Sequence, residues 1–322
     1  MRRKKHFDWG IIGGILACLL FCSPGLFSGG RDSASDLMPV PEKIVRREGA
    51  FRLTEAFSVA GEGPLSPRAA RAASRLMMRL AERTGLFLVQ DHLKDQTPTA
   101  TTTLTYRWER IGKLLPNEDE SYSLRVDPDK IILQSRTDIG VLRGFETLLQ
   151  LLDSDSRGYY FPSVGIEDRP RFTWRGLLID ACRHFMPVDV VKRNLDAMAA
   201  VKLNVMHWHL SEDQGFRVEC KTFPKLHRMG SDGAYYTQTE IKDIIAYAGE
   251  RGIRVMPEFD IPGHSTSWFV GYPEFASSAG PFSIERKFGI FGPTFNPTAE
   301  KTYRFFDLFF KEMSGLFTDP YM

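Results

Sequence analysis

The sequence predicts an α/β protein in which a parallel sheet covered by helices follows a small α+β domain. Two observations carry this prediction. After Trp174, an apolar strand and an amphipathic helix alternate three times, which is the pattern of consecutive βα units. Before that residue, strand-like and helix-like stretches occur in separate runs. Three βα units in a row imply a parallel sheet, either an eightfold barrel or an open doubly wound sheet.

The first thirty residues predict an export or anchoring segment. An apolar run over residues 9–21 follows four basic residues, Arg2, Arg3, Lys4 and Lys5. A basic start before such a run is typical of a secretory signal peptide or an uncleaved membrane anchor. We assign residues 1–30 to this segment and residues 31–40 to a linker. The protein is therefore expected to be secreted, periplasmic or membrane-anchored, with any membrane attachment made through residues 1–30.

Charge and cysteine content argue against two classes of protein. The first thirty residues hold four basic residues and one acidic residue, so their removal changes the formal net charge from +2 to −1. No block of lysine and arginine remains that would bind nucleic acid. Outside the first thirty residues the cysteines are Cys182 and Cys220. One pair is not a disulfide framework, and both residues can equally be buried thiols.

Residues 41–168 predict the small α+β domain. Helices are indicated over residues 69–83 and 141–152, where apolar residues recur three and four positions apart. One strand is indicated by the alternation of residues 122–126, and another by the apolar run that follows the turn-like Asp127-Pro128-Asp129. Strands and helices in separate runs favour a small α+β domain.

The first two βα units begin at the apolar run over residues 175–181. The run is nearly continuous, as expected of a strand that is buried on both faces. The helix after it is expected to bury a stripe formed by Val188, Val191, Leu195 and Met198. Residues 203–210 predict the second strand. The second helix begins with the capping-box pattern of Thr237 and Glu240 and ends at Gly252.

The third βα unit is marked as clearly. Residues 253–260 predict its strand, and Asn296-Pro297 can open its helix. The expected buried stripe of that helix consists of Tyr303, Phe306, Phe310 and Met313. Gly315 follows the stripe and is expected to mark the end of the helix.

Charged residues gather where each of these strands ends, at residues 180–184, 207–213 and 258–264. Parallel α/β folds bind their ligands at this edge. His207 and His209 share one face of the second strand because side chains alternate along a strand. Such a pair can ligate a metal, take part in acid–base chemistry or pack in the core. No glycine-rich phosphate loop follows the first strand, so a dinucleotide-binding fold is not expected.

Three segments around these strand ends are RGLLIDACRHF, NVMHWHLSEDQGFR and IRVMPEFDIPGHSTSW, which start at residues 175, 204 and 253. In order and spacing they closely resemble the family 20 glycoside hydrolases, the β-N-acetylhexosaminidases. The resemblance extends from about Tyr122 to residue 322. It implies a hexosaminidase-like α+β domain over residues 41–168 and a (β/α)8 TIM-barrel catalytic domain over residues 169–322, of which the first three βα units are present.

The resemblance also implies a reaction. Enzymes of this family remove terminal, non-reducing, β-linked N-acetylglucosamine or N-acetylgalactosamine with retention of configuration, by a substrate-assisted mechanism. The acetamido oxygen of the substrate attacks the anomeric carbon, an Asp orients the acetamido group, and the adjacent Glu protonates the leaving oxygen. The expected partner is therefore a glycan with a terminal N-acetylhexosamine. No cofactor and no metal is needed, and His207 and His209 are then not metal ligands.

Six residues of this sequence match positions of the family pattern, and Asp213 is a further possible site residue. Arg183 matches the arginine that binds hydroxyls of the terminal sugar, and a guanidinium fork suits paired oxygens. His264 matches the histidine near the general acid, and Glu212 matches the carboxylate that holds this histidine. Many members have Asp where this chain has Glu212, so the longer side chain must reach differently. Glu258 and Asp260 match the strand end of the third segment and Trp268 matches the tryptophan after it; these three are expected to orient neighbouring groups, pack or touch sugar. Asp213 follows Glu212 and is a possible site residue, with a loop pairing to Arg217 as the alternative.

The catalytic Asp-Glu pair of the family lies in a Gly-Gly-Asp-Glu motif at the end of the fourth barrel strand, and the 322 residues contain no such motif. The segment LFTDPYM at the end of the sequence resembles the chain leading into that strand. Three parallel strands cannot close a barrel and leave an open edge. We therefore expect a truncated chain that is inactive as written. The alternative is a non-catalytic remnant that binds sugar or a partner protein.

Overall fold

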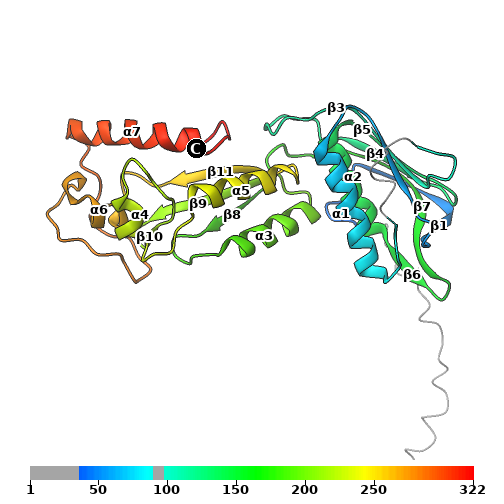
Figure 1. Ribbon diagram of the computed structural model, residues 1–322, viewed down its shortest axis with the longest axis horizontal. Helices are drawn as coiled ribbons and strands as arrows, with labels where there is room; N and C mark the ends of the chain where they lie inside the picture. The colour runs from blue at the N-terminus through cyan, green and yellow to red at the C-terminus, as the bar shows by residue number, and fades with distance from the viewer. Residues whose placement is uncertain (1–35, 90–97) are drawn as a thin grey trace, which may run out of the picture. The chain divides into compact units, whose positions relative to one another are not determined.

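The computed structural model describes residues 36–89 and 98–322, which contain two β-sheets (Figure 1). The predicted export segment lies outside the described residues, as does the first half of the predicted linker. None of the helices described is both long enough and apolar enough to span a bilayer.

The first sheet has seven strands in the order β1-β7-β4-β5-β3-β2, with β6 paired to β7. Its strands are β1 (Lys43–Arg52), β2 (Val59–Glu62), β3 (Leu104–Arg110), β4 (Tyr122–Val126), β5 (Ile131–Thr137), β6 (Asp153–Asp155) and β7 (Gly158–Asp168). Parallel and antiparallel pairs are mixed: β3 runs parallel to β2 and β5, whereas β4 and β7 are antiparallel to their neighbours. The sheet packs against the helices α1 (Pro67–Thr84) and α2 (Asp138–Leu151), which lie side by side.

Local sequence sets the bounds of α1. The Ser66 hydroxyl accepts a hydrogen bond from the amide of Ala69 at 3.1 Å and so caps the first turn. Gly85 ends the helix in the left-handed conformation at φ 71°, which costs a glycine no steric strain. The buried face of α1 consists of Ala69, Ala72, Ala73, Leu76, Met77 and Leu80. Its small residues let the helix approach the sheet and α2 closely.

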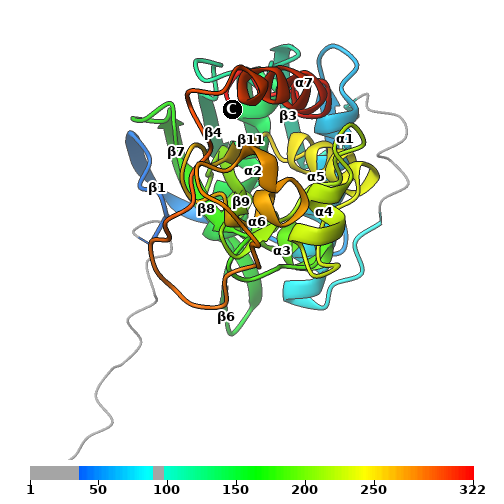
Figure 2. The same cartoon turned by 90° about the vertical axis from the view of Figure 1, so that its left-hand side faces the viewer.

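The second sheet has the order β8-β9-β11, all parallel, with β10 paired antiparallel to β9. Its strands are β8 (Gly176–Asp180), β9 (Val205–Glu212), β10 (Gly215–Phe216) and β11 (Arg254–Phe259). Its helices are α3 (Val188–Ala200), α4 (Lys225–Gly230), α5 (Gln238–Gly249), α6 (Thr266–Gly271), the 3₁₀ helix η2 (Pro273–Phe275) and α7 (Glu300–Leu316). Figure 2 shows these elements facing the viewer.

The predicted capping box forms in α5. The Thr237 side chain accepts from the amide of Glu240, and the Glu240 carboxylate accepts from the amide of Thr237 at 2.8 Å. The helix ends at Gly249, and Gly252 takes a left-handed conformation with φ 67° just before β11. A side chain at Gly252 would also crowd the guanidinium of Arg143, which donates a hydrogen bond of 2.7 Å to the Gly252 carbonyl.

Two details of the second sheet differ from the prediction. Strand β8 was expected to be buried on both faces, yet Leu177 is 36% exposed and Leu178 is 54% exposed. The reason is that β8 pairs only with β9 among the described strands, so it is an edge strand. In α7, Met313 is buried as expected, but Tyr303, Phe306 and Phe310 are not among the buried residues. The buried residues of the helix are Thr302, Phe305, Phe309, Met313 and Leu316. Tyr303 is half exposed, because the aromatic residues of α7 cover two adjacent faces and packing selects the other one.

Buried polar contacts join the two sheets. Glu120, beside β4, accepts hydrogen bonds of 2.6 Å from both Arg143 and Arg175, and one of 2.8 Å from Asn204. Lys202, at the end of α3, donates to Asp168 of β7 at 3.0 Å. All of these groups have partners, which is the condition under which a buried polar network stabilises a structure. These contacts hold the N-terminal ends of β8 and β9 against the first sheet.

Candidate functional site

The parallel register of the second sheet brings the three charged strand ends together. His209 lies on β9, the middle strand of the three. It is opposite Asp180 of β8 on one side and opposite Glu258 of β11 on the other. Carboxyl ends of parallel strands meet at one edge, so the loops after β8, β9 and β11 share a small volume. This volume contains Arg183 and His264 as well.

Asp180 positions the side chain and the backbone of Arg183 through hydrogen bonds. Its Nη1 donates to Asp180 Oδ2 at 2.7 Å, and the amides of Cys182 and Arg183 donate to Asp180 Oδ1 at 2.9 and 3.1 Å. Burial alone would lower the pKa of Arg183, but the hydrogen bond with Asp180 and the negative charge of Glu212 raise it. The guanidinium is thus permanently charged, and with its side chain 33% exposed it can still offer donors to a ligand.

Glu212 is the centre of the site. Its side chain is 1% exposed, and its Oε1 lies against Arg183 Nη2 and 2.8 Å from His264 Nδ1. Its Oε2 accepts a hydrogen bond of 2.7 Å from the amide of Asp213. A buried carboxylate needs such charged and polar partners. The sequence predicted that this carboxylate holds His264, and the structure brings both of them together with Arg183.

His264 lies in the loop between β11 and α6 and faces the open side of the site, with its side chain 40% exposed. Its backbone is left-handed, with φ 54°, which costs a residue other than glycine energy. Ser265 supports this turn, because its hydroxyl donates to the carbonyl of Gly263 at 2.7 Å and lies 3.2 Å from the carbonyls of Asp260 and Pro262. The loop therefore fixes the position of the imidazole.

Asp213 and Trp268 point into the protein. Asp213 is 1% exposed and accepts from the amide and hydroxyl of Thr266 at 2.9 and 2.6 Å, so it holds the start of α6. The alternative pairing with Arg217 is wrong, because Arg217 donates to backbone carbonyls, among them those of Ala181, Cys182, Ser231 and Ala234. Trp268 is 1% exposed and packs against Phe216, Phe295 and Phe309. Both positions favour a supporting role over direct contact with a ligand.

Glu258 joins the two histidines of β9. Its Oε2 lies 2.5 Å from His207 Nε2 and 3.0 Å from His209 Nδ1. His209 is buried, and its Nε2 lies 3.9 Å from Glu212 Oε1. For His207 and His209, the sequence allowed metal binding, acid–base chemistry or core packing. In the structure both histidines contact the Glu258 carboxylate, and His209 also lies near Glu212.

Asp260 shares a hydrogen bond with Glu258. Burial, this hydrogen bond and the negative charge of Glu258 raise the pKa of Asp260 to about 6. Burial would also raise the pKa of Glu258, but the hydrogen bond from Asp260 and the nearby histidines lower it. Asp260 therefore holds the proton of the pair below about pH 6, and Glu258 carries the charge.

This pair predicts a pH dependence of stability. The folded-state pKa of Asp260 is about 6 and its ordinary value is 3.8, so its contribution is present at low pH and is lost as the pH rises through about 6. Asn at this position cannot ionise. We expect Asp260→Asn to gain stability relative to the unmutated chain between about pH 5 and about pH 7. Urea unfolding of both proteins at the two pH values measures this, and an unchanged difference would contradict the assignment.

Within residues 36–89 and 98–322, three groups of side chains have the atoms that a metal ion would need. They are Asp180–Cys182–His209, His209–Glu258–Asp260 and Glu212–Asp213–His264, each with its ligand atoms within 4.8 Å of one another. In each group another partner competes with a cation. Arg183 lies against Glu212, Asp260 shares its proton with Glu258, and burial raises the pKa of the Cys182 thiol well above its usual range.

We therefore expect that His207 and His209 bind no metal ion in function. Elemental analysis of the purified chain, after dialysis against metal-free buffer, should find less than one equivalent of zinc, manganese or nickel. Stoichiometric zinc that is lost on His209→Ala, with the fold retained by circular dichroism, would overturn this expectation.

Two neighbours of the site were given no role from the sequence. Asp180 lies in the charged strand end at residues 180–184, and its pairing with Arg183 could have been predicted, because a carboxylate three residues before an arginine is a common pairing. Phe288 carries no such signal: it is 91% exposed in the loop before α7, and its ring centre lies 5.8 Å from the Arg183 guanidinium. A cavity of about 290 Å³ opens here, lined by Arg183, Gln214, Arg217, Glu285, Arg286, Lys287 and Phe288. A charged fork beside an exposed ring suits a polyhydroxyl ligand.

Family models match almost the whole described chain. The model described as "Glycosyl hydrolase family 20, catalytic domain" matches residues 172–322, which include all the site residues above. The model described as "Glycosyl hydrolase family 20, domain 2" matches residues 34–169, which include the first sheet.

Individual relatives agree with these models. The β-hexosaminidase subunit beta of Mus musculus is 43% identical over 209 residues, covering 64% of this chain and 38% of that protein. The β-hexosaminidase of Vibrio furnissii is 34% identical over 314 residues, covering 89% of this chain and 47% of that protein. Among solved structures, the chitobiase of Flavobacterium johnsoniae has a TM-score of 0.85 and 48% identity, covering 88% of this chain and 43% of the other. The chain thus spans less than half the length of these relatives.

Proposed function

The chain belongs to glycosyl hydrolase family 20, and we propose that its residues form one side of the active site of a β-N-acetylhexosaminidase. The reaction is removal of a terminal, non-reducing, β-linked N-acetylglucosamine or N-acetylgalactosamine from a glycan, with retention and by substrate assistance. The closeness of the chain to β-hexosaminidases over both sheets supports this proposal.

We propose further that residues 169–322 form the first three βα units of a (β/α)8 barrel and that residues 41–168 form the domain before it. The parallel order β8-β9-β11, with helices between successive strands, supports the barrel. So does the exposure of Leu177 and Leu178 on β8, because the edge strand of a partial barrel lacks the neighbour that would cover it.

The contact of Glu212 with both Arg183 and His264 carries the proposal. One buried carboxylate positions a cationic fork and an imidazole on the same open side of the strand ends. In the proposed enzyme, Arg183 binds hydroxyls of the terminal sugar, and His264 lies beside the general acid. Glu258 contacts His207 and His209, and His209 in turn lies next to Glu212, so these three residues support the position of Glu212.

The residues of this chain do not supply every group that the reaction needs. The 322 residues contain no Gly-Gly-Asp-Glu segment, so neither the acetamide-orienting Asp nor the general acid Glu of the family pattern is among them. General acid catalysis contributes about 10²–10⁴-fold to such a reaction. We therefore propose that a polypeptide of these 322 residues alone does not turn over N-acetylhexosaminides at an enzymatic rate.

The test compares two proteins on a chromogenic N-acetylglucosaminide. One is the polypeptide of residues 31–322, and the other joins the same residues to the remaining C-terminal part of the Flavobacterium johnsoniae chitobiase, called the chimera below. We expect turnover by the chimera only, with the folding of both proteins checked by circular dichroism. Activity of the short polypeptide that disappears on Glu258→Gln would show that the catalytic carboxylates are misassigned. A folded chimera without activity would favour the non-catalytic binding protein instead.

We propose that the protein is exported from the cytoplasm. The basic residues and the apolar run within the first thirty positions support this proposal. In a bacterial host that expresses the full chain, cell fractionation should recover the protein from the periplasm or the membrane. A form that lacks residues 2–30 should stay in the cytoplasm. Recovery of the full, unprocessed chain from the cytoplasm alone would contradict the proposal.

A further inference from the structure

Helix α1 presents a row of arginines on one face. Arg71, Arg75, Arg79 and Arg83 follow one another at intervals of four residues. Residues four apart are neighbours on a helix surface, and like charges at this spacing destabilise the helix. A row of four guanidiniums therefore needs negative groups on the facing elements.

In the part of the chain that the structure describes, the facing elements supply two carboxylates to this row, Glu146 and Glu250. Arg79 Nη1 donates to both oxygens of Glu146 at 2.7 Å. Glu250 is shared, since it lies 3.0 Å from Arg71 but 3.9 Å from Arg75. Arg75 also donates a hydrogen bond of 2.9 Å to the backbone carbonyl of Glu250. Arg83 donates one of 2.5 Å to the backbone carbonyl of Leu149. Arg75 is thus a partly buried cation whose ion pair with Glu250 is long and is shared with Arg71.

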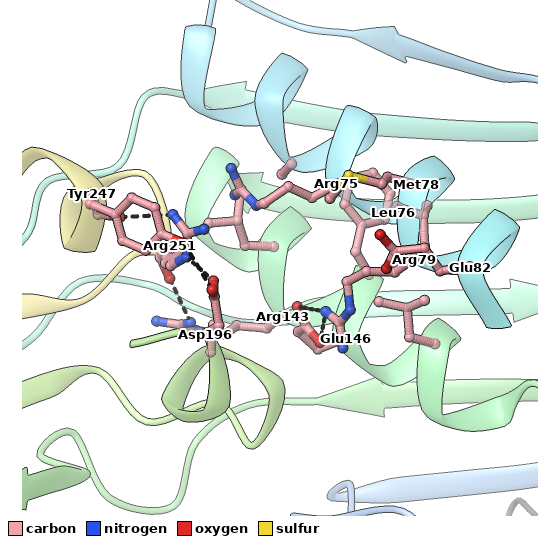
Figure 3. A pocket seen from close by; sticks show the side chains of 15 residues that line it. Arg75, Leu76, Met78, Arg79, Glu82, Arg143, Glu146, Asp196, Tyr247 and Arg251 are labelled. Atoms are coloured by element: carbon pink, nitrogen blue, oxygen red, sulfur yellow. Dashed lines mark hydrogen bonds and ion pairs between the residues drawn. The ribbon is translucent and has the colours of Figure 1, made fainter. Parts of the chain in front are cut away.

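A cavity of about 330 Å³ lies beside Arg75, between α1, α2, α3 and α5 (Figure 3). Arg251 also lines it, with its guanidinium 3.4 Å from the Tyr247 ring centre and its Nε donating to Asp196 at 2.6 Å. Arg143 lines it too, and its charge is matched by Glu120. Of the acidic residues around the cavity, Glu146 and Asp196 already pair with arginines, and Glu82 is exposed.

Burial and neighbouring positive charges disfavour the charged forms of Arg75 and Arg83. Burial and the positive charge of Arg251 lower the pKa of Arg75. Burial and the positive charge of Arg79 likewise lower the pKa of Arg83. An anion in the cavity would remove this penalty. The guanidinium fork binds the paired oxygens of a phosphate or carboxylate in a bidentate manner.

We propose that the cavity between α1, α2, α3 and α5 binds a compact dianion of the phosphoryl class, with Arg75 as its main ligand and Arg251 and Arg79 beside it. Free phosphate and the phosphate group of a phosphomonoester share this chemistry. The site is separate from the strand ends of the second sheet and does not depend on the glycosidase proposal.

The test is a thermal unfolding titration of the full chain with sodium phosphate, glucose 6-phosphate and glucose, at constant ionic strength set with sodium chloride. Phosphate also stabilises proteins generally at high concentration because it is excluded from their surfaces, so the titration stays in the low millimolar range. We expect a saturable rise of the melting temperature of about 2–4 °C with phosphate or the phosphomonoester. A larger rise with glucose 6-phosphate would identify a phosphomonoester as the better ligand. Glucose should have no effect.

The matched variants are Arg75→Gln and Arg193→Gln, which remove the same charge. Arg193 lies on α3, outside the cavity, and its side chain is 73% exposed. The rise should vanish in Arg75→Gln and persist in Arg193→Gln. If Arg75→Gln fails to fold, Arg75→Lys keeps the charge but loses the fork, and phosphorus NMR should show at least about tenfold weaker binding. No saturable rise in the unmutated chain, or an equal effect in the Arg75 variants, would overturn the proposal.

Discussion

Replacing Glu212 by Gln in the chimera is expected to lower kcat/KM on the chromogenic N-acetylglucosaminide by about 30- to 5,000-fold. Removing one partner of a buried charge pair costs about 2–5 kcal/mol, and each 1.36 kcal/mol lost from transition-state stabilisation is about tenfold in rate. Glu212 is buried and contacts both Arg183 and His264. The amide therefore removes one of the two carboxylates that contact the Arg183 guanidinium, the other being Asp180, and it removes the charged partner of the His264 imidazole.

The control for this variant is Glu300→Gln. Glu300 lies at the start of α7 with its side chain 75% exposed, and its nearest cation is Arg304 at 3.7 Å. This variant should keep the activity of the unmutated chimera within about twofold, since exposed ion pairs contribute little. Equal activity of Glu212→Gln and Glu300→Gln would show that Glu212 does not position the site.

Replacing Asp319 by Asn is expected to lower the free energy of unfolding of the chain by about 3–5 kcal/mol, because it leaves a buried guanidinium without its counter-ion. Arg254 donates to Asp319 at 2.7 and 2.8 Å, and the two side chains are 3% and 2% exposed. Arg254 begins β11, so its loss of a partner acts on the strand that carries Glu258. Urea unfolding followed by circular dichroism measures the change.

The matched control is Asp189→Asn on α3. Asp189 lies 3.9 Å from Arg193, and both side chains are about three-quarters exposed. Its loss should cost at most about 1 kcal/mol, which includes its interaction with the N-terminal end of the helix. A cost for Asp319→Asn as small as for this control would mean that the buried pair contributes little to the stability of β11.

Local signals in the sequence predicted individual elements well. The alternation of residues 122–126 gave the bounds of β4, and the capping box of Thr237 and Glu240 marked the start of α5. Such features depend on neighbouring residues alone. In α7, by contrast, Tyr303, Phe306 and Phe310 have the same helical spacing as the residues that are actually buried. The spacing cannot tell which face packs, because that choice depends on the strands and helices opposite.

The candidate site was predictable only in part, for a similar reason. Sequence segments identified Arg183, Glu212 and His264, but not that one carboxylate contacts both of the others. The joining of His207 and His209 by Glu258 requires the register between β9 and β11, which are more than forty residues apart. Register and loop conformation are long-range properties. They decide whether a strand-end residue faces the ligand, as His264 does, or the core, as Trp268 does.

The position of a bound sugar is the most direct test of the proposed sugar site. A crystal structure of the chimera with N-acetylglucosamine should show the sugar at the ends of β8, β9 and β11, with its hydroxyls about 3 Å from the Arg183 guanidinium and His264 close by. Binding should be lost in Arg183→Met, with the fold intact. A sugar bound elsewhere, with Arg183 and His264 free of contact, would contradict the assignment of these strand ends as a sugar site.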